Sequence, residues 1–280
     1  MTGPVVVFDR PTLRLRRNRA AERFSDHDFL YREVAERLLD RLDDITRKFP
    51  LALDLGCLGG SVAQCLKGRG GIETLVQCEL AENMARRADR VAAKAGLRAL
   101  TVVGDEEFLP FAEGSFDLVV SNLNLHWIND LPGVLIQARR ALKPDGLFLA
   151  TLLGAGSLAE LRESLATAET ALENGLSPRV SPFPDVRDGA HLLQRAGFAM
   201  PVADTDRIVV RYRDLSRLMA DLRGVGATNA VALRRRNFSR RATLAAAMAA
   251  YQDRYADAEG RLPVTFEILT LTAWAAPEET

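Results

Sequence analysis

The sequence predicts an α/β protein built on a doubly wound, mostly parallel β-sheet. Short apolar runs of strand length alternate with longer segments of helical periodicity, a pattern typical of βαβ units. Right-handed crossovers then place helices on both faces of the sheet, which explains why the runs are apolar throughout. The predicted strands cover residues 51–55, 74–78, 99–103, 116–120 and 147–153, and the predicted helices between them cover 61–67, 81–95 and 131–142.

The chain after Gly154 predicts a helical elaboration that closes with an antiparallel strand. Helical spacing occurs at 158–173, 191–196, 215–222 and 243–255, and residues 206–212 and 264–274 alternate as strands do. We therefore expect one domain in three parts: an N-terminal helical segment at 1–45, a ligand-binding core at 46–154, and an elaboration at 155–280 that completes the same domain.

Composition narrows the classes of function. The chain has 280 residues and a formal net charge of zero, which gives no indication of a nucleic-acid partner. No apolar run reaches the length of a transmembrane helix, so no transmembrane segment is expected. The three cysteines form no CxxC pair and the three histidines are scattered, so we expect neither a disulfide framework nor a metal site.

Location is predicted from weaker signals. Only four of the 37 basic residues are lysine, which points to a bacterial source and a cytoplasmic location, with the inner face of the membrane included. Positive residues dominate between Arg10 and Arg23, as in a mitochondrial presequence, and a matrix location is therefore the alternative. Asp9, Glu22 and the scarcity of serine argue against a presequence.

A glycine-rich turn follows the first predicted strand in Asp54-Leu55-Gly56-Cys57-Leu58-Gly59-Gly60. At this place in a doubly wound sheet, the end of the strand and the start of the next helix form a ligand crevice. The spacing is not that of a dinucleotide motif, and the acid before the first glycine suits a ligand with an ammonium group. An ordinary strand-to-helix turn is the alternative interpretation.

Two further acids follow the next strands. Glu79 ends the second strand, where a carboxylate can accept hydrogen bonds from both ribose hydroxyls. Asp105 follows the third strand, where it can accept a bond from an adenine amine. Either acid alone could be a helix cap. Three acids after three successive strands instead predict a single nucleoside-binding site.

These residues, with Phe116-Asp117-Leu118-Val119-Val120-Ser121 and the Leu142-Lys143-Pro144-Asp145-Gly146 turn, resemble the motifs of class I S-adenosylmethionine-dependent methyltransferases, which have a Rossmann-like fold. The resemblance implies that Asp54, Gly56 and Gly60 hold the methionine part of S-adenosylmethionine. It further implies that Glu79 holds the ribose and Asp105 the adenine, with Leu80 and Glu106 beside the ring. Asn122, which follows the fourth strand, is expected to line the same site.

A narrower resemblance covers nearly the whole chain. Phe8-Asp9-Arg10, the segment from Asp105 to Phe111, Leu125-His126-Trp127, Ser177-Pro178 with Ser181-Pro182-Phe183, and Arg195-Ala196-Gly197-Phe198 resemble the respiratory complex I assembly factor 5 family. That family implies hydroxylation of an arginine in a complex I subunit, and therefore a protein substrate. A more distant similarity is to the malonyl-carrier-protein methyltransferase of biotin synthesis.

Leu58 departs from the methyltransferase pattern, which has glycine there. If the position requires a positive φ, leucine costs roughly 1–2 kcal/mol. An enzyme that modifies arginine, a methyltransferase for a malonyl-type carboxylate, and an assembly chaperone with a degenerate cofactor site are therefore the three hypotheses.

Catalytic residues are not identified by the sequence, and His126 is the candidate base near the acceptor. Its alternative role is structural, packing beside Trp127 and capping the local backbone. Asn124 has a similar position and a similar alternative. Two arginine clusters, one at Arg14, Arg16, Arg17 and Arg19 and one at Arg234, Arg235, Arg236, Arg240 and Arg241, are candidate contacts for an acidic protein or an anionic membrane surface, or are solvated helix faces.

Overall fold

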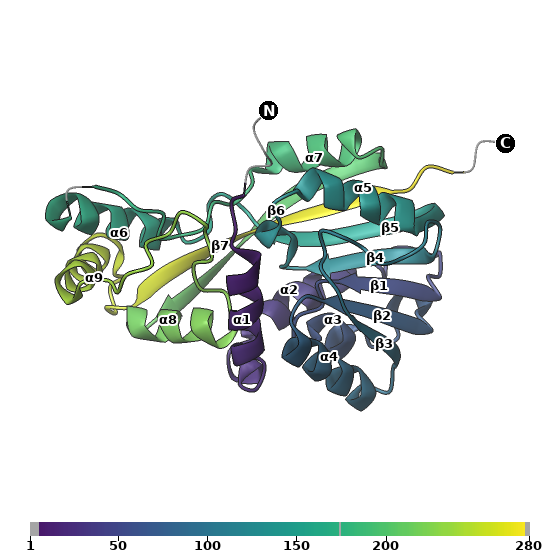
Figure 1. Cartoon of the computed structure of the whole chain (residues 1–280), viewed down its shortest axis with the longest axis horizontal. Helices are drawn as coiled ribbons and strands as arrows, with labels where there is room; N and C mark the ends of the chain where they lie inside the picture. Colours follow the sequence, from purple (N-terminus) through teal and green to yellow (C-terminus); the bar gives the residue numbers. More distant parts are fainter. Residues whose placement is uncertain (1–5, 174, 278–280) are drawn as a thin grey trace.

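The computed structural model describes residues 6–173 and 175–277 of the chain. These residues contain a seven-stranded sheet in the order β3-β2-β1-β4-β5-β7-β6, in which β7 runs antiparallel to both neighbours and the other paired strands are parallel (Figure 1). The strands are β1 (Leu51–Leu55), β2 (Thr74–Glu79), β3 (Arg98–Val103), β4 (Phe116–Asn122), β5 (Leu142–Leu153), β6 (Ala199–Tyr212) and β7 (Leu262–Trp274).

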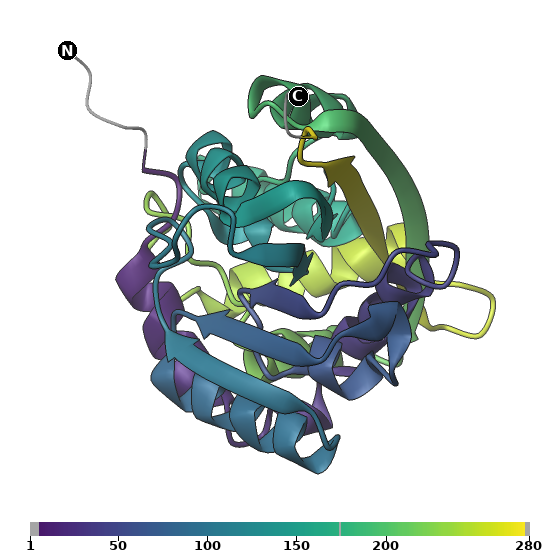
Figure 2. The same ribbon diagram turned by 90° about the vertical axis from the view of Figure 1, so that its right-hand side faces the viewer.

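Helices cover both faces of the twisted sheet, as Figure 2 shows from the side. α2, α3 and α4 pack on one face, and α5 and α7 pack on the other. The helices are α1 (Arg10–Ala20), α2 (Phe29–Asp40), α3 (Ser61–Cys65), α4 (Glu82–Lys94), α5 (Leu131–Ala141), α6 (Ala159–Leu172), α7 (Val186–Arg195), α8 (Leu215–Gly224) and α9 (Arg241–Tyr255). A short 3-10 turn, η3 (Leu125–Trp127), follows β4.

The central strands are buried on both sides because their side chains alternate between two apolar layers. In β1, Ala52 belongs to the cluster under α2 and α3, whereas Leu53 and Leu55 belong to the cluster under α5. This alternation follows from the two-residue period of a strand. It explains why an uninterrupted apolar run predicted a central parallel strand correctly.

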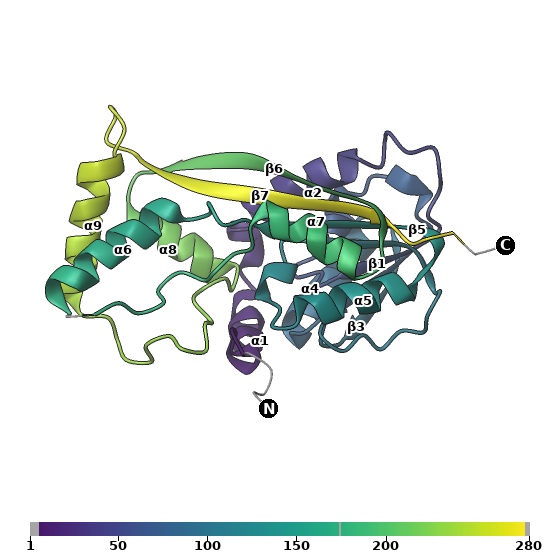
Figure 3. The same cartoon turned by 90° about the horizontal axis from the view of Figure 1, so that it is seen from above.

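The second lobe is carried by a long antiparallel pair of strands. β5 pairs with β7 from Ile268 to Trp274, whereas β6 pairs with β7 as far as Leu262, so the two strands continue past the end of β5. Figure 3 shows α6, α8 and α9 gathered around this extension. α1 lies between the two parts and contacts both α4 and α8.

The predicted fold class is confirmed, including the antiparallel C-terminal strand and the helical insertion, whereas several element bounds differ from expectation. β6 begins at Ala199 rather than at residue 206, and α3 ends at Cys65 rather than at residue 67. The Lys143–Gly146 segment is not a free turn but a bulge at the start of β5, with Asp145 at φ +57°. α7 begins at Val186, five residues earlier than predicted, because Asp185 caps it by accepting from the Arg187 N–H at 2.9 Å. Because β6 and β7 share one sheet with β1, we keep the chain as a single domain and the boundaries at residues 45 and 154 as a proposal.

Candidate active site

The three predicted acids meet at the carboxyl edge of the sheet. Asp54 lies near the end of β1, Glu79 ends β2, and Asp105 and Glu106 follow β3. Asp54, Glu79 and Glu106 are fully buried. Parallel strands bring their carboxyl ends to one edge, so acids from separate segments form one cluster.

Asp54 is the most exceptional member of this cluster. Both of its carboxyl oxygens are buried and neither has a hydrogen-bond partner. Burial, and then the charge of Glu79, raise the pKa of Asp54 well above its ordinary value. A buried carboxyl group without partners is costly to the fold, so this side chain has acceptors available for a cationic ligand.

Glu79 is held by the backbone of the neighbouring loops. Its oxygens accept from the N–H groups of Leu58 and Ala81, each at 3.0 Å. Burial raises the pKa of Glu79, whereas the nearby Arg17 and the two amide donors lower it, and the net direction is upward. These two hydrogen bonds fix the orientation of the Glu79 carboxylate, and its remaining lone pairs can accept further hydrogen bonds.

Arg17 lies inside the acid cluster, which the sequence did not predict. Its Nη1 is 3.3 Å from Glu79 Oε1 and 3.4 Å from Glu106 Oε1, and its Nη2 donates to Asn124 Oδ1 at 2.6 Å. With 1% of its surface exposed, it is among the largest fully buried side chains. The N-terminal arginine cluster is thus not one surface, and the predicted role of Arg17 as an external contact is wrong.

Arg10 is the second internal arginine of α1. It donates to Asp105 at 2.5 Å and also binds Glu106. Arg10, Leu13, Arg17 and Ala20 form the buried face of α1, where their spacing of three, four and three residues matches one side of a helix. This spacing was the available signal, but a run with so many arginines did not indicate which of them turn inward.

The glycine loop is closely packed in this structure. Gly56 has φ +71°, and a Cβ atom there would lie 1.8 Å from Asn124 Nδ2, so the Asn124 side chain sits against this glycine. Gly60 has φ +85° and is the N-cap residue of α3, and its missing Cβ makes room for Ala88 and Val91 of α4. The absence of a side chain at Gly56 therefore allows Asn124 to approach the loop closely, and its absence at Gly60 allows α4 to pack against the start of α3.

Leu58 adopts φ +48°, which confirms that its position requires the left-handed conformation. Its side chain is buried in the same apolar cluster as Phe24, Tyr31 and Leu123. Burial of leucine there offsets the backbone strain of roughly 1–2 kcal/mol. The backbone N–H of Leu58 still reaches Glu79, so the substitution has preserved the loop contact that orients the acid.

Leu80 and Asp105 line a shallow pocket of about 460 Å³ beside the acid cluster. Arg10, Arg14 and Asn18 of α1 also line this pocket. An apolar side chain and a carboxylate facing one cavity are the groups that a purine ring needs, one for stacking and one for its amine. The structure thus brings two of the three predicted base contacts together, whereas Glu106 is fully buried and paired with Arg10 and Arg17.

Asn122 and His126 are occupied with the protein itself. Asn122 donates to the Tyr31 carbonyl and accepts from the Thr151 hydroxyl, both at 2.9 Å. His126 Nδ1 accepts from the Leu153 N–H at 3.3 Å, and its ring packs against Trp127. Burial and the charge of Arg17 lower the pKa of His126 to about 3, which makes it a weak base. These contacts match the structural role considered for His126.

Comparisons with known proteins agree with this geometry. A family model described as a methyltransferase domain matches residues 53–150. The chain is 44% identical over 270 residues to the mitochondrial arginine-hydroxylase NDUFAF5 of Homo sapiens, a match that covers 96% of this chain and 76% of that protein. It is 36% identical over 274 residues to the malonyl-[acyl-carrier protein] O-methyltransferase of Xylella fastidiosa, covering 98% of this chain and 90% of that one. The chain belongs to this class I methyltransferase family.

The fold likeness of this methyltransferase extends to solved structures with little sequence similarity. The YcgJ protein of Bacillus subtilis superposes with a TM-score of 0.59 at 16% identity, covering 87% of this chain and 99% of that one. The family shown by its relatives is one of S-adenosylmethionine-dependent enzymes.

Of the three acids expected to hold S-adenosylmethionine, Asp54 has free acceptors, whereas arginines of α1 occupy Glu79 and Asp105. The unpartnered Asp54 suits the ammonium group, whereas Asp105, which lines the pocket with Leu80, is held by Arg10 at 2.5 Å. Between them, Arg17 lies against Glu79, the expected ribose ligand. If Glu79 and Asp105 hold the cofactor as the family resemblance implies, Arg17 and Arg10 have to leave these positions when it binds.

Proposed function

We propose that this chain binds S-adenosylmethionine through Asp54, Glu79 and Asp105. The observation that carries the proposal is the buried carboxyl group of Asp54, which has no partner in the described residues and lies beside Gly56 at the end of β1. The cofactor, when bound, supplies an electrophilic methyl group on a sulfonium. The chain's own residues position the acceptor and exclude water, because a buried acid cluster places the reacting groups in a low-dielectric site.

The proposed acceptor is an arginine side chain of a respiratory complex I subunit, modified during assembly by hydroxylation. This is a two-electron oxidation in which dioxygen, with an external reductant, supplies the oxygen atom, and the methyl group of the cofactor is not transferred. The identity of 44% to an arginine-hydroxylase across nearly the whole chain supports this proposal. The acid cluster also supports it, because oxygens of Glu106 and Asn124, neither of which is assigned to the cofactor in this proposal, already hold a guanidinium, that of Arg17. Such a site has the acceptors that a substrate guanidinium requires.

Mass spectrometry of complex I tests this assignment. Complex I is purified from the source organism, from a deletion strain, and from the deletion strain carrying either the native gene or an Asp54→Asn version. An arginine-containing peptide should lose the mass of one oxygen atom in the deletion strain and regain it with the native gene alone. An unchanged modification state in the deletion strain refutes the assignment.

A second candidate is methyl transfer to the carboxylate of a malonyl carrier thioester. The 36% identity to a malonyl-[acyl-carrier protein] O-methyltransferase over 98% of the chain favours it. Growth of the deletion strain without biotin separates the two candidates. A biotin requirement would support the carboxylate acceptor, and normal growth would support the arginine acceptor.

A non-catalytic assembly chaperone is the third candidate, and Leu58 together with the buried Arg17 motivates it. Calorimetry with S-adenosylmethionine on the native chain and on Leu58→Gly decides between enzyme and chaperone. Tight binding by the native chain supports the enzyme, and binding by the variant alone supports the chaperone.

The proposed location is the bacterial cytoplasm near the inner face of the membrane, with the mitochondrial matrix as the alternative. Relatives named as mitochondrial and relatives from bacteria both occur in the family. No helix in the described ranges is long and apolar enough to cross a bilayer. Fractionation of the source cells into cytosol and membranes tests this location.

A further inference from the structure

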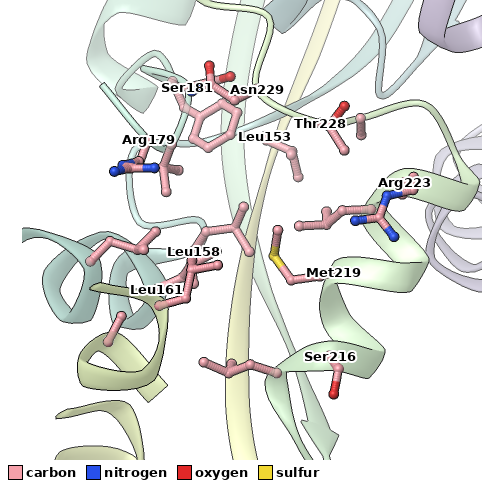
Figure 4. A pocket seen from close by; sticks show the side chains of 18 of the residues that line it. Leu153, Leu158, Leu161, Arg179, Ser181, Ser216, Met219, Arg223, Thr228 and Asn229 are labelled. Atoms are coloured by element: carbon pink, nitrogen blue, oxygen red, sulfur yellow. The ribbon is translucent and has the colours of Figure 1, made fainter. Parts of the chain in front are cut away.

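The second lobe encloses an apolar chamber of about 430 Å³ beyond the acid cluster. Three helices line it through leucine and methionine side chains, with Leu158 and Leu161 on one side, Met219 and Leu222 on another, and Leu244 and Met248 on a third. Figure 4 shows Leu158, Leu161 and Met219 pointing into this space. Its volume lies within the range of sites that hold a small apolar ligand.

Two strongly basic hollows open beside this chamber. One is lined by Arg16, Arg19, Arg217 and Arg223, and the chamber shares Arg223 and Thr228 with it. The other contains Arg234, Arg235 and Arg236, and the chamber shares Arg179 and Met219 with it. The three spaces therefore adjoin one another, and the apolar chamber lies next to two positively charged hollows.

Several of these arginines lack a negative partner. Within residues 6–173 and 175–277, Arg19, Arg223 and Arg236 take part in no ion pair, whereas Arg217 pairs with Asp221. Arg16 donates to the Thr228 carbonyl at 2.8 Å. Uncompensated positive charges that face one hollow repel each other, so an anion placed among them would be stabilising.

An exposed apolar pair lies on the loop that forms one basic mouth. Phe238 is 103% exposed and Leu233 is 84% exposed, and the intervening residues include Arg235 and Arg236. Large apolar side chains are rarely presented so completely to water, and a basic segment carrying them is typical of an interfacial lipid contact. This loop begins directly beside the hollow.

We propose that the second lobe binds an anionic phospholipid of a bilayer. One acyl chain would enter the apolar chamber, and the phosphate would lie among Arg16, Arg19 and Arg223. Phe238 and Leu233 would rest in the bilayer interface. The chamber would bind the acyl chain of one phospholipid and the arginines its phosphate, and the exposed apolar pair would contact the neighbouring lipids of the bilayer. This proposal does not rest on the proposed function, because no residue of the acid cluster takes part in it.

Vesicle binding tests the proposal with the intact chain. Sedimentation is measured with vesicles of phosphatidylcholine alone and with vesicles containing phosphatidylglycerol. Binding should be at least about tenfold stronger to the anionic vesicles and should weaken as salt is added. Equal binding to both vesicle types, or binding to neither, overturns the proposal.

Variants assign the binding to the hollow and its loop. The double variant Arg19→Glu with Arg223→Glu and the single variant Phe238→Ser should each reduce vesicle binding by about tenfold or more. Matched controls on the far side of the molecule are Arg90→Glu and Leu100→Ser, which are exposed on α4 and β3 and should bind like the native chain. Equal losses in test and control variants overturn the proposal.

A soluble probe separates a bilayer lipid from a free amphiphile. Monomeric lysophosphatidylglycerol should bind the native chain and lose affinity in Met248→Trp, which narrows the chamber, but not in Phe238→Ser. Binding of this probe without any binding of vesicles would mean that the ligand is a soluble amphiphile, and the bilayer proposal would fail. Asp54→Asn should bind vesicles normally, so failure of the cofactor proposal remains distinguishable.

Discussion

Replacing Arg17 with methionine removes a buried positive charge from the centre of the acid cluster while keeping most of the side-chain volume. Arg17 Nη1 lies 3.3 Å from Glu79 and 3.4 Å from Glu106, so each ion pair contributes about 5 kcal/mol at an effective dielectric constant of about 20. The desolvation of buried ions offsets much of this, and loss of one partner from a buried pair costs roughly 3–5 kcal/mol. Arg10 still neutralises Glu106 in the variant. We therefore expect a loss of unfolding free energy at the lower end of this range, about 3 kcal/mol.

The melting temperature measures this change. For a chain of this size, about 3 kcal/mol corresponds to a fall of roughly 6–12 °C in Tm. Removing Arg17 raises the pKa of Glu79 further above its ordinary 4.5, so the folded state holds that proton more tightly than the unfolded state. Stability therefore falls as pH rises above about 4.5, and the difference between variant and native chain should be larger at pH 8 than at pH 5.

Arg14→Met is the matched control, because Arg14 is exposed on the same helix. Its Tm should match that of the native chain. S-adenosylmethionine brings its own positive charge and competes with Arg17 for the cluster, so it should raise the Tm of Arg17→Met more than that of the native chain. Equal melting temperatures for the two variants, or a destabilisation that shrinks as pH rises, would refute the reasoning.

Three further outcomes follow from the site. Asp54→Asn should abolish S-adenosylmethionine binding in calorimetry and melt no lower than the native chain, with its advantage growing as pH rises, because it removes a buried carboxyl whose pKa is raised; retained binding would contradict the assignment. His126→Gln should lower stability by about 1–2 kcal/mol through the lost Leu153 contact, yet leave the pH profile of turnover unchanged, whereas a loss of about 100-fold or more in rate would identify His126 as a base. Gly56→Ala should destabilise the fold more than Gly68→Ala in chemical denaturation, because both have positive φ but only Gly56 faces the Asn124 side chain, and equal effects would show that the close approach is unimportant.

Much of the site was predictable because its residues are tied to strand ends. Asp54, Glu79 and Asp105 each lie at or just beyond a parallel strand, and the common direction of those strands brings them to one edge. For Leu58 the sequence raised a positive φ only as a condition, and the structure shows that the loop adopts it with leucine present. Local pattern and sheet topology together sufficed for the three acids.

The second arginine cluster shows where local pattern stops. Arg234 pairs with Asp9, and Arg235 pairs with Glu173, whereas Arg236 has no ion pair within the described ranges. These partners lie far away in the sequence, and their distances depend on how the loop folds over α1 and α6. Spacing along the chain carries no information about such pairs. The sequence therefore identified the cluster but could not distinguish its ion-paired arginines from those without an acidic partner.

The sequence by itself determined the strands of a mostly parallel α/β sheet, the acids at their ends and the family, because these depend on short-range periodicity and on motifs within one segment. Only the tertiary structure decided that α1 turns Arg10 and Arg17 into the acid cluster and that α6, α8 and α9 enclose a chamber. Both depend on how helices distant in the sequence pack against each other, and the burial of a charged side chain is settled by the partners that such packing supplies.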